Sequence, residues 1–596
     1  MARWADATVD GVRHRPHTLA IMIEHRRSLR LLVCAIFAAI LYLPALGRPA
    51  LWEPDEGRYA EIAREMVLTQ DWATPRDDWV RYFEKPPLVY WAEAAAISVL
   101  GPKELAVRLP AALSSVAEVV ITAALGEAMF GPATGVAAAA VLALCPLVFG
   151  FARFATLDPT LAMFFTAALG AFWAAARTPG FDSAASRRWF VLAAALSAAG
   201  TLVKGPVALV LIGAVALAWL LAERRALEIL RTPWLWAFLV YVVIATPWFA
   251  LAALRNPEFL RFFFIHEHLE RYLQSSEHGW GPYFLLGVVA GGTWPWICFV
   301  PLGVRELLRA GGISPATSAP SEGRGALRFL LLWFAVVLVF FSIPRSKLGS
   351  YILPAIPPLA IIAGYALCQL PRLESRAIRR SFLAVAILNL IATDLAAATL
   401  LHLARELNLR LIIDGFAAIS VITLASLVSL TVAWRGRNVG AAICALVFGA
   451  VIALGMLVKA RVDAMPLGSY RLLARAVTPY LDQGCRLASY RHFVQSLPFY
   501  TGHREALVDY RGELGPFGAS ADARASFIAS DHDLAQLWQG PECAVLIVNR
   551  SDIPHIRGLL RTAAAPIACE GKKFALYNRS VPLPPNAGSC ASEIGP

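Results

Sequence analysis

The stretch RPALWEPDEGRYAEIAREMVLTQDWATPRDDWVRYFEKPPLVYW, residues 48–91, separates two long apolar runs of the chain. It mixes acids, bases and aromatic residues, and long loops of this composition usually carry function. From Asp55 onward, Tyr59, Ile62 and Met66 recur at helical spacing, while Arg58 falls outside that stripe. The pattern predicts a helix that lies on a membrane surface at the start of this loop.

The composition of the whole chain excludes an ordinary soluble enzyme. Of 596 residues, 58% are hydrophobic and 16% are charged, against about 25% charged in soluble proteins. The mean hydropathy is +0.58. The 54 Lys and Arg exceed the 42 Asp and Glu by 12, but these cations lie mostly in short loops between apolar runs. The sequence therefore predicts a polytopic α-helical membrane protein and no nucleic-acid partner.

The apolar runs set the expected number of spans. The first, 31–46, follows Arg26, Arg27 and Arg30. A cleaved signal peptide is the alternative for this run, but no convincing small-x-small cleavage site follows it, so we expect a retained helix. The other runs are 87–101, 106–126, 133–150, 157–176, 189–203, 206–222, 233–254, 283–304, 327–343, 351–369, 381–401, 411–433 and 438–458.

The basic residues set the orientation, because Lys and Arg concentrate in cytoplasmic loops. Basic clusters follow every second run, at Arg177/Arg187/Arg188, Arg224/Arg225/Arg231, Arg305/Arg309/Arg324/Arg328, Arg372/Arg376/Arg379/Arg380 and Arg435/Arg437. The loops at Asp158, at Lys204, at 255–282 and at 344–350 are then external. With the N-terminus in the cytoplasm, the stretch between Arg48 and Arg108 begins and ends outside. Run 87–101, which is short and contains Glu93, therefore does not span, and thirteen transmembrane helices remain. The alternative is that 87–101 spans as a short helix and another run is broken.

The C-terminal part has the pattern of a soluble α/β domain. Residues 1–458 form the expected membrane domain, with a first external loop at 48–86, and residues 459–596 form the soluble domain. Segments 485–490, 506–510, 543–549 and 574–578 predict strands, and 469–481 and 552–561 predict helices. Cys485, Cys543, Cys569 and Cys590 all fall in this domain, which predicts one or two disulfides of open pairing.

The external side holds the candidate chemical groups. Its cations are Arg58, Lys85, Lys204, Arg345 and Lys347, where the distribution of charge in membrane proteins disfavours them. A snorkelling or ion-paired side chain explains any one of them, but five cations near apolar helix ends on one face weigh against that explanation jointly. Asp55 and Asp158 are the acidic candidates, and for both a helix-capping role is the alternative.

Several motifs carry a family resemblance over almost the whole chain. They are WEPDEGRYAEIAREM, DWATPR and RYFEKPPLVYW in the first loop, ARFATLDPTLAMFF (152–165), LVKGPVALV (202–210) and FFSIPRSKLGSYILPAIPPLA (340–360). These segments resemble the ArnT-like glycosyltransferases of the GT-C class, in the glycosyltransferase 83 family, which are related to protein O-mannosyltransferases. The resemblance implies a GT-C fold with about thirteen transmembrane helices and a C-terminal periplasmic domain.

The resemblance also implies an activity. Such enzymes transfer 4-amino-4-deoxy-L-arabinose from undecaprenyl phosphate to lipid A, on the periplasmic side of the bacterial inner membrane, and so give resistance to polymyxin. The implied partners are the undecaprenyl phosphate-linked sugar, lipid A and membrane lipids, with the protein a monomer. The sugar itself and the lipid A phosphate that is modified remain open.

The resemblance assigns roles to individual residues. Asp55 matches the aspartate near the reacting centre. The implied substrate and lipid-phosphate site comprises Arg58, Tyr82, Lys85, Asp158, Lys204, Arg345, Lys347 and Tyr351. A structural zinc ion is implied at Glu84, His266 and His492, with His503 as the fallback for the third ligand. Without the resemblance, a zinc site and unrelated surface histidines explain these residues equally well, because no compact ligand spacing is present.

Two other functions stay open at this point. A lipid or sugar transporter would also have many helices, but transporters place ionisable residues near the membrane midplane, whereas here they lie at outer helix ends. A protein O-mannosyltransferase-like enzyme would share the early aspartate. The chain has no nucleotide-binding motif, which predicts a lipid-linked donor and no nucleotide cofactor.

Overall fold

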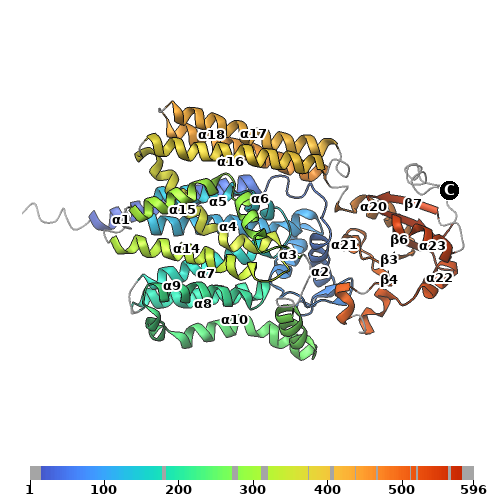
Figure 1. Cartoon of the computed structure of the whole chain (residues 1–596). Helices are drawn as coiled ribbons and strands as arrows, with labels where there is room; N and C mark the ends of the chain where they lie inside the picture. The colour runs from blue at the N-terminus through green and yellow to red at the C-terminus, as the bar shows by residue number, and fades with distance from the viewer. Residues whose placement is uncertain are drawn as a thin grey trace, which may run out of the picture.

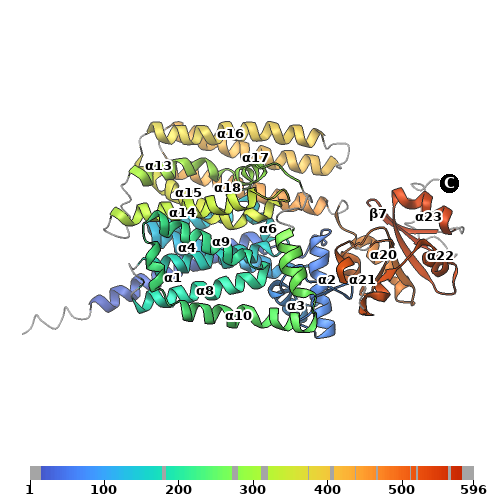
Figure 2. The same cartoon turned by 60° about the horizontal axis from the view of Figure 1, so that its bottom comes forward.

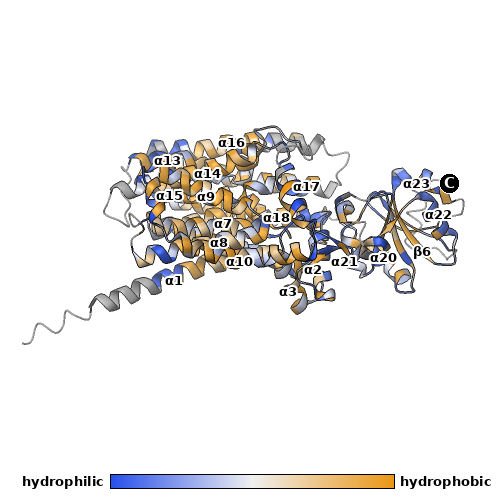
Figure 3. Ribbon diagram, turned by 90° about the horizontal axis from the view of Figure 1, so that it is seen from below, coloured by the Kyte–Doolittle hydropathy of each residue, from blue (hydrophilic) through white to orange (hydrophobic). Residues whose placement is uncertain are grey.

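The computed structural model consists of a helical bundle with an α/β domain at one end (Figures 1 and 2). Colouring by hydropathy shows that the bundle is predominantly apolar, whereas the C-terminal domain alternates apolar and polar segments (Figure 3). The structure describes residues 15–177, 181, 183–270, 279–309, 320–373, 375–402, 409–435, 438–464, 468–510, 512–517, 521–560 and 565–579.

The long helices fit a membrane-spanning bundle. By length and composition, 7 described helices could cross a membrane, or up to 9 spans if each of two bent pairs counts as one. The chain is therefore a polytopic α-helical membrane protein, and the number thirteen stays a prediction that this set is consistent with. The bundle helices are α1 (Arg15–Tyr42), α4 (Glu104–Phe130), α5 (Pro132–Ala143), α6 (Pro146–Ala152), α7 (Asp158–Ala176), α8 (Ala184–Lys204), α9 (Val207–Ala222), α10 (Trp234–Arg255), α12 (Phe284–Gly292), α13 (Val300–Arg309), α14 (Pro320–Ser342), α15 (Ile356–Gln369), α16 (Ser375–His402), α17 (Leu409–Trp434) and α18 (Val439–Asp463).

Two runs that the sequence analysis treats as single spans are broken helices. Run 133–150 becomes α5 and α6, bent by 66°, with Pro146 opening the second helix. Run 283–304 becomes α12 and the segment Trp296–Arg309, bent by 93°, with Pro295 at the junction. Proline lacks an N–H and its ring clashes with the preceding turn, so an apolar run can continue where the helix cannot.

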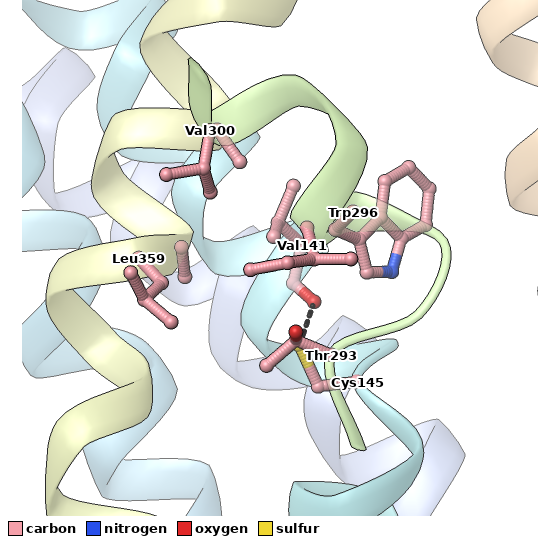
Figure 4. Close-up of a pocket in the computed structure, with 9 residues that line it drawn as sticks. Val141, Cys145, Thr293, Trp296, Val300 and Leu359 are labelled. Carbon is pink, nitrogen blue, oxygen red and sulfur yellow. Dashed lines mark hydrogen bonds between the residues drawn. The ribbon is translucent and has the colours of Figure 1, made fainter. Parts of the chain in front are cut away.

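The two breaks pack against each other and against α15. Figure 4 shows the small apolar pocket between them, where the Cys145 thiol donates to the Val141 carbonyl at 3.2 Å. The pocket is lined by Val141, Cys145, Thr293, Trp296, Ile297, Val300, Leu359, Ala360 and Ala363. It contains no charged group, so this pocket is part of the bundle packing and is not a candidate site.

Helix α3 (Leu88–Leu100) agrees with the expectation that 87–101 does not span. Its 13 residues extend about 20 Å, against about 30 Å for the hydrocarbon core. It packs on α2 (Asp55–Thr69) and α4 at the end of the bundle next to the C-terminal domain (Figure 1). That 87–101 does not span stays a prediction.

Helix α2 forms where expected but does not lie on a surface. Residues Glu56 to Met66 are all buried, because α2 packs against α3 and α4 on one side and α21 (Ser496–Thr501) of the C-terminal domain on the other. At Gly57 a Cβ would lie 2.6 Å from the backbone nitrogen of Ser496, so glycine permits this approach. The charged side chains of the helix are neutralised inside the protein, for example in the Arg64–Glu61 pair at 2.6 Å.

The C-terminal domain contains a six-stranded sheet of order β5-β4-β3-β6-β8-β7. Strands β3 to β6 are parallel, and β8 and β7 extend the sheet in antiparallel pairs. The elements are α20 (Arg471–Leu481), β3 (Arg486–Tyr490), β4 (Glu505–Val508), β5 (Phe527–Ile528), α22 (Asp531–Gln539), β6 (Ala544–Asn549), α23 (Ile553–Leu560), β7 (Ala565–Glu570) and β8 (Lys573–Tyr577). The four expected strands and two expected helices are confirmed, whereas β5, β7 and α22 were not expected.

Two further details refine the expected organisation. Helix α18 continues to Asp463, beyond the boundary expected at 458, because Lys459 pairs with Asp414 of α17 at 2.6 Å and with Asp463 at 2.9 Å. Of the pairings left open, a disulfide joins Cys485 to Cys543 across the starts of β3 and β6. Cys590 lies outside the described residues.

Candidate active site

A cavity of 1140 Å³ opens where the bundle meets α2 and the first loop. Its polar and charged lining includes Glu53, Asp55, Arg58, Tyr59, Glu84, Lys85, Asp158, Lys204, Glu267, His268, Tyr351 and Arg461. Its apolar lining includes Leu147, Phe151, Phe154, Val207, Val210, Phe264, Phe340 and Phe341. The cavity therefore offers a polar end for a charged group and an apolar wall for a hydrocarbon chain.

Asp55 and Arg58 share the first turn of α2 and face this cavity. The Arg58 guanidinium lies 3.4 Å from the Asp55 carboxylate and 2.7 Å from Glu513 of the C-terminal domain. The Asp55 side chain is 42% exposed, against 7% for Arg58. Pro54 occupies the N-cap position of the helix, so Asp55 is not its N-cap residue. It is instead a carboxylate held in the cavity wall by a buried cation.

Asp158 and Lys204 meet because α7 begins where its antiparallel neighbour α8 ends. The Lys204 ammonium forms an ion pair with Asp158 and lies 4.4 Å from the centroid of the Tyr351 ring. An acid at a helix N-terminus and a base at a helix C-terminus also complement the helix dipoles. Gly205 ends α8 with φ +80° in contact with His268, a position where a side chain would collide.

Lys85 is the third cation in the wall. Its ammonium lies 3.1 Å from the Glu84 carbonyl, 3.5 Å from the Glu267 carboxylate and 3.8 Å from the Glu84 carboxylate. Each of these three cations therefore has carboxylate partners, so the cavity is a balanced polar site that can bind a phosphate when the pairs rearrange.

Three residues of the implied phosphate site do not line the cavity. Tyr82 is buried, and its hydroxyl accepts a weak 3.5 Å contact from Arg58. Lys347 is 2% exposed and donates to the backbone carbonyls of Trp280, at 3.1 Å, and Pro344. Arg345 is exposed to solvent. Tyr82 therefore supports Arg58 from behind the wall, and Lys347 ties the segment after α14 to the chain at Trp280.

The residues implied for zinc are not gathered into one site. Glu84 lines the cavity, whereas His266 is exposed and lies 3.0 Å from Glu270. His492 is buried in the C-terminal domain, 2.6 Å from the Tyr490 carbonyl, and burial together with Lys573 lowers its pKa to about 3. The fallback His503 pairs with Asp482 at 3.2 Å.

Within the described part of the chain, no three His, Cys, Asp or Glu side chains are arranged to hold a metal ion. His268, two residues along from His266 in the helical turn Arg261–Glu270, is the histidine that reaches the cavity. The side chains of the described residues therefore do not fit the implied zinc.

A buried ion network behind Asp55 was not expected from the sequence. The fully buried Glu56 carboxylate binds Arg108 at 2.7 Å and Arg461 at 2.8 Å and accepts from the Ala155 backbone N–H at 2.8 Å. Burial acts to raise its pKa, but Arg108 and Arg461 outweigh burial and lower it to about 2. The available signal was Arg108 itself, since an arginine inside an apolar run requires a partner.

The C-terminal domain closes the site from outside. Glu53 accepts from the Ser496 N–H at 2.8 Å, Leu51 donates its N–H to the Tyr500 hydroxyl at 2.7 Å, and Asp78 accepts from the Glu505 N–H at 2.9 Å. With the Arg58–Glu513 pair, these bonds fix the first loop, and Asp55 with it, against the domain.

Comparisons with known proteins agree with this architecture. A family model described as dolichyl-phosphate-mannose-protein mannosyltransferase matches residues 27–263, and one described as aminoarabinose transferase C-terminal domain matches residues 473–572. An undecaprenyl phosphate-alpha-4-amino-4-deoxy-L-arabinose arabinosyl transferase of Erwinia tasmaniensis is 32% identical over 354 residues, which is 59% of this chain and 62% of that protein. The protein of that name from Pseudomonas aeruginosa PAO1 is 33% identical over 389 residues, 64% of this chain and 66% of that one. The matches thus span a little under two thirds of these relatives.

Solved structures give the wider match. ArnT from Cupriavidus metallidurans bound to undecaprenyl phosphate has a TM-score of 0.79 with 27% identity, covering 93% of this chain and 99% of that one. Its apo form has a TM-score of 0.78 with 26% identity, covering 95% and 98%. Both parts of the chain, the bundle with its cavity and the C-terminal domain, therefore correspond to one known architecture. The chain is an ArnT-like protein with the GT-C fold.

Proposed function

We propose that this protein is a glycosyltransferase that moves 4-amino-4-deoxy-L-arabinose, or a related sugar, from undecaprenyl phosphate to lipid A. The observation that carries the proposal is the cavity, whose lining combines Asp55 and the cations Arg58, Lys85 and Lys204 with aromatic and aliphatic side chains. The structural similarity to an ArnT bound to undecaprenyl phosphate supports the donor. The names of the curated relatives support the sugar.

The donor places opposite demands on the two parts of the cavity. Its phosphate is the leaving group, and the negative charge that develops on it is stabilised by preorganised cations. Arg58, Lys85 and Lys204 supply these from α2, the first loop and α8. The polyprenyl chain requires an apolar surface, which Phe340, Phe341 and their neighbours provide.

Asp55 is the proposed catalytic residue. A lipid A phosphate is already ionised at neutral pH, so the acceptor needs positioning more than deprotonation. In this proposal the Asp55 carboxylate faces the sugar and stabilises positive charge as the bond to the leaving phosphate breaks. The Arg58 contact at 3.4 Å orients it.

The proposed location is the bacterial inner membrane, with the cavity and C-terminal domain in the periplasm. The clusters of basic residues after alternate runs support this orientation, and it places the cavity on the side where an outer-leaflet acceptor is reached. The disulfide Cys485–Cys543 fits an oxidising compartment. Transfer to lipid A would make the cell surface less anionic and give resistance to cationic antimicrobial peptides such as polymyxin.

One observation favours a second candidate. The match of residues 27–263 to the protein mannosyltransferase model supports an enzyme that glycosylates a protein hydroxyl from a lipid-linked sugar. The aminoarabinose transferase C-terminal match at 473–572 favours the lipid acceptor. Both candidates share the donor class, so the acceptor decides between them.

A reconstituted reaction tests the proposal. Purified protein in proteoliposomes is supplied with the undecaprenyl phosphate-linked aminosugar and either lipid A or a serine- and threonine-rich peptide. Mass spectrometry should detect a glycosylated lipid A and an unchanged peptide. Glycosylation of the peptide alone would establish the second candidate instead.

A further inference from the structure

Arg461 is a cavity cation outside the donor-binding set. It lies in the last turn of α18, on the wall formed with Trp52, Phe151 and Phe154. Its guanidinium lies 2.8 Å from the Glu56 carboxylate, donates to the Arg153 carbonyl at 2.5 Å and stacks 4.8 Å from the Phe154 ring centroid. These two hydrogen bonds use one N–H on each terminal nitrogen. A guanidinium has five N–H donors in total.

The surroundings of Arg461 carry excess positive charge. Arg108 and Arg153 lie behind it. Arg108 and Arg461 share one carboxylate, Glu56, and both also repel Arg153, so cations outnumber anions in this cluster. The other described bonds of Arg108 and Arg153 go to neutral backbone carbonyls, those of Leu46, Pro49, Ala50, Leu41, Tyr42 and Pro44.

Among the described residues, Glu104 does not remove this excess. Glu104, the next acid in the surroundings of Arg108, is itself paired with Arg471 at 2.8 Å. Burial and then repulsion from Arg461 and Arg108 lower the pKa of Arg153 to about 10. The donor cations differ in this respect, since Lys204 has Asp158, Lys85 has Glu267, and Arg58 has both Asp55 and Glu513.

We propose that Arg461 binds a phosphate group of the acceptor lipid, at a subsite separate from the donor phosphate. The inference rests on the proposed function, because transfer to lipid A requires two phosphate-bearing lipids in one cavity. Two anions repel each other, so the second needs a cation that the first does not use. Arg461 provides it from an under-neutralised cluster, and the adjoining Phe151 and Phe154 provide apolar surface for an acyl chain.

The subsite is also linked to the proposed catalytic group. Glu56, which holds Arg461, is the residue directly after Asp55 in α2. The same carboxylate therefore fixes the start of the catalytic helix and the acceptor cation. A phosphate bound by Arg461 would be positioned relative to Asp55 through one buried network.

Paired binding measurements test the subsite in the full-length protein. Wild type, Arg461→Ala and Arg461→Lys are titrated with lipid A, with lipid A whose phosphates have been removed, and with undecaprenyl phosphate. Lys459→Ala is the matched control, because Lys459 lies on the same helix but is exposed and paired with Asp414 and Asp463. We expect wild type to prefer phosphorylated lipid A by roughly tenfold or more, Arg461→Ala to lose that preference, and Arg461→Lys to keep part of it.

Undecaprenyl phosphate affinity should change by less than about twofold in every variant, and Lys459→Ala should match wild type throughout. In transfer assays, Arg461→Ala should raise the KM for lipid A and leave the KM for the donor unchanged, a split that a merely structural role would not give. Equal binding of the two lipid A forms by wild type, which requires no variant, would overturn the subsite. So would a loss of undecaprenyl phosphate binding in Arg461→Ala. Absence of any transfer by wild type would instead contradict the proposed function.

Discussion

The chemistry of the cavity depends most on Asp55, which is the proposed catalytic group and is partly exposed. We predict that Asp55→Asn lowers kcat by about a thousandfold, because the amide keeps the shape but cannot stabilise positive charge at the sugar. Undecaprenyl phosphate affinity should stay within about threefold, since Arg58, Lys85 and Lys204 remain. Transfer and binding assays on one preparation check both parts, and a variant that retains normal turnover would reduce Asp55 to a partner of Arg58.

Lys204 and Lys347 give opposite predictions although both are lysines on the same side. Lys204→Ala should weaken undecaprenyl phosphate binding by roughly tenfold, because its ammonium lies in the cavity wall. Lys347→Ala should leave that affinity nearly unchanged and lower Tm, because its ammonium is buried on backbone carbonyls that would lose their donor. Lipid titration and thermal unfolding measure the two effects. Weaker donor binding in Lys347→Ala, with Tm unchanged, would show that Lys347 belongs to the phosphate site.

The sequence predicted part of the cavity lining, but not every side chain that faces the cavity. Arg58, Lys85 and Lys204 were correct as cavity cations. Lys347 was indistinguishable from them because the turn after α14 that buries its ammonium depends on contacts with Trp280, far away in the chain. His266 and His268 are two residues apart in one helical segment and therefore face different directions. The sequence alone does not show which of them faces the cavity.

Helix α2 is stabilised by a buried ion network that joins three helices. We predict that Glu56→Gln lowers stability by about 3 to 5 kcal/mol, because Arg108 and Arg461 would then lie buried beside a neutral amide. The measurement is thermal unfolding in detergent at neutral pH. Glu61→Gln is the matched control on the same helix, since its carboxylate pairs with Arg64 and hydrogen-bonds Glu65, both within one turn, and joins no other helix in these contacts. Equal Tm losses in the two variants would show that the Glu56 network contributes no more to stability than the contacts of Glu61.

The same carboxylate predicts a pH dependence. The folded pKa of Glu56, about 2, lies below its ordinary value of 4.5. A depressed carboxylate pKa stabilises the folded state above the unfolded value, and this contribution disappears as pH falls from about 4.5 towards about 2. The Tm difference between wild type and Glu56→Gln should therefore shrink across that window. A difference that stays constant down to about pH 2.5 would contradict the assignment.

Broken helices mark the limit of span prediction. Runs 133–150 and 283–304 are apolar throughout, so hydropathy alone predicted one straight span for each, whereas Pro146 and Pro295 divide them. The short α3 was predicted as a helix, and its length and Glu93 are the reasons to expect that it does not cross. Helix α2 was predicted in position but not in burial, since the partners that neutralise its charges come from α4, α18 and the C-terminal domain.

The contact between the bundle and the C-terminal domain contains carboxylates that burial keeps protonated. Burial raises the pKa of Glu53 to about 7 and that of Glu505 to about 8, and it also raises the pKa of Asp78. The folded state therefore binds more protons than the unfolded state, so stability is greatest below about pH 4.5 for these groups and falls as pH rises towards about 8.

We accordingly predict that the docked domain loosens at alkaline pH. Thermal unfolding should show a lower Tm at about pH 8.5 than at about pH 6, and Glu505→Gln should flatten that slope because it cannot ionise. Hydrogen exchange, corrected for its intrinsic pH dependence, should locate the change in residues 51–58 and 496–508. A Tm that rises with pH over this range would contradict the prediction.

The central claim is that the assembled molecule transfers a lipid-linked aminosugar to lipid A. The direct measurement is mass spectrometry of lipid A from bacterial cells that make the undecaprenyl phosphate-linked aminoarabinose and lack their own transferase. Cells that express the protein should contain lipid A with an added aminopentose, and cells that express Asp55→Asn to the same level should not. Unmodified lipid A in cells with the wild-type protein, under conditions where an Erwinia tasmaniensis relative restores the modification, would contradict the account.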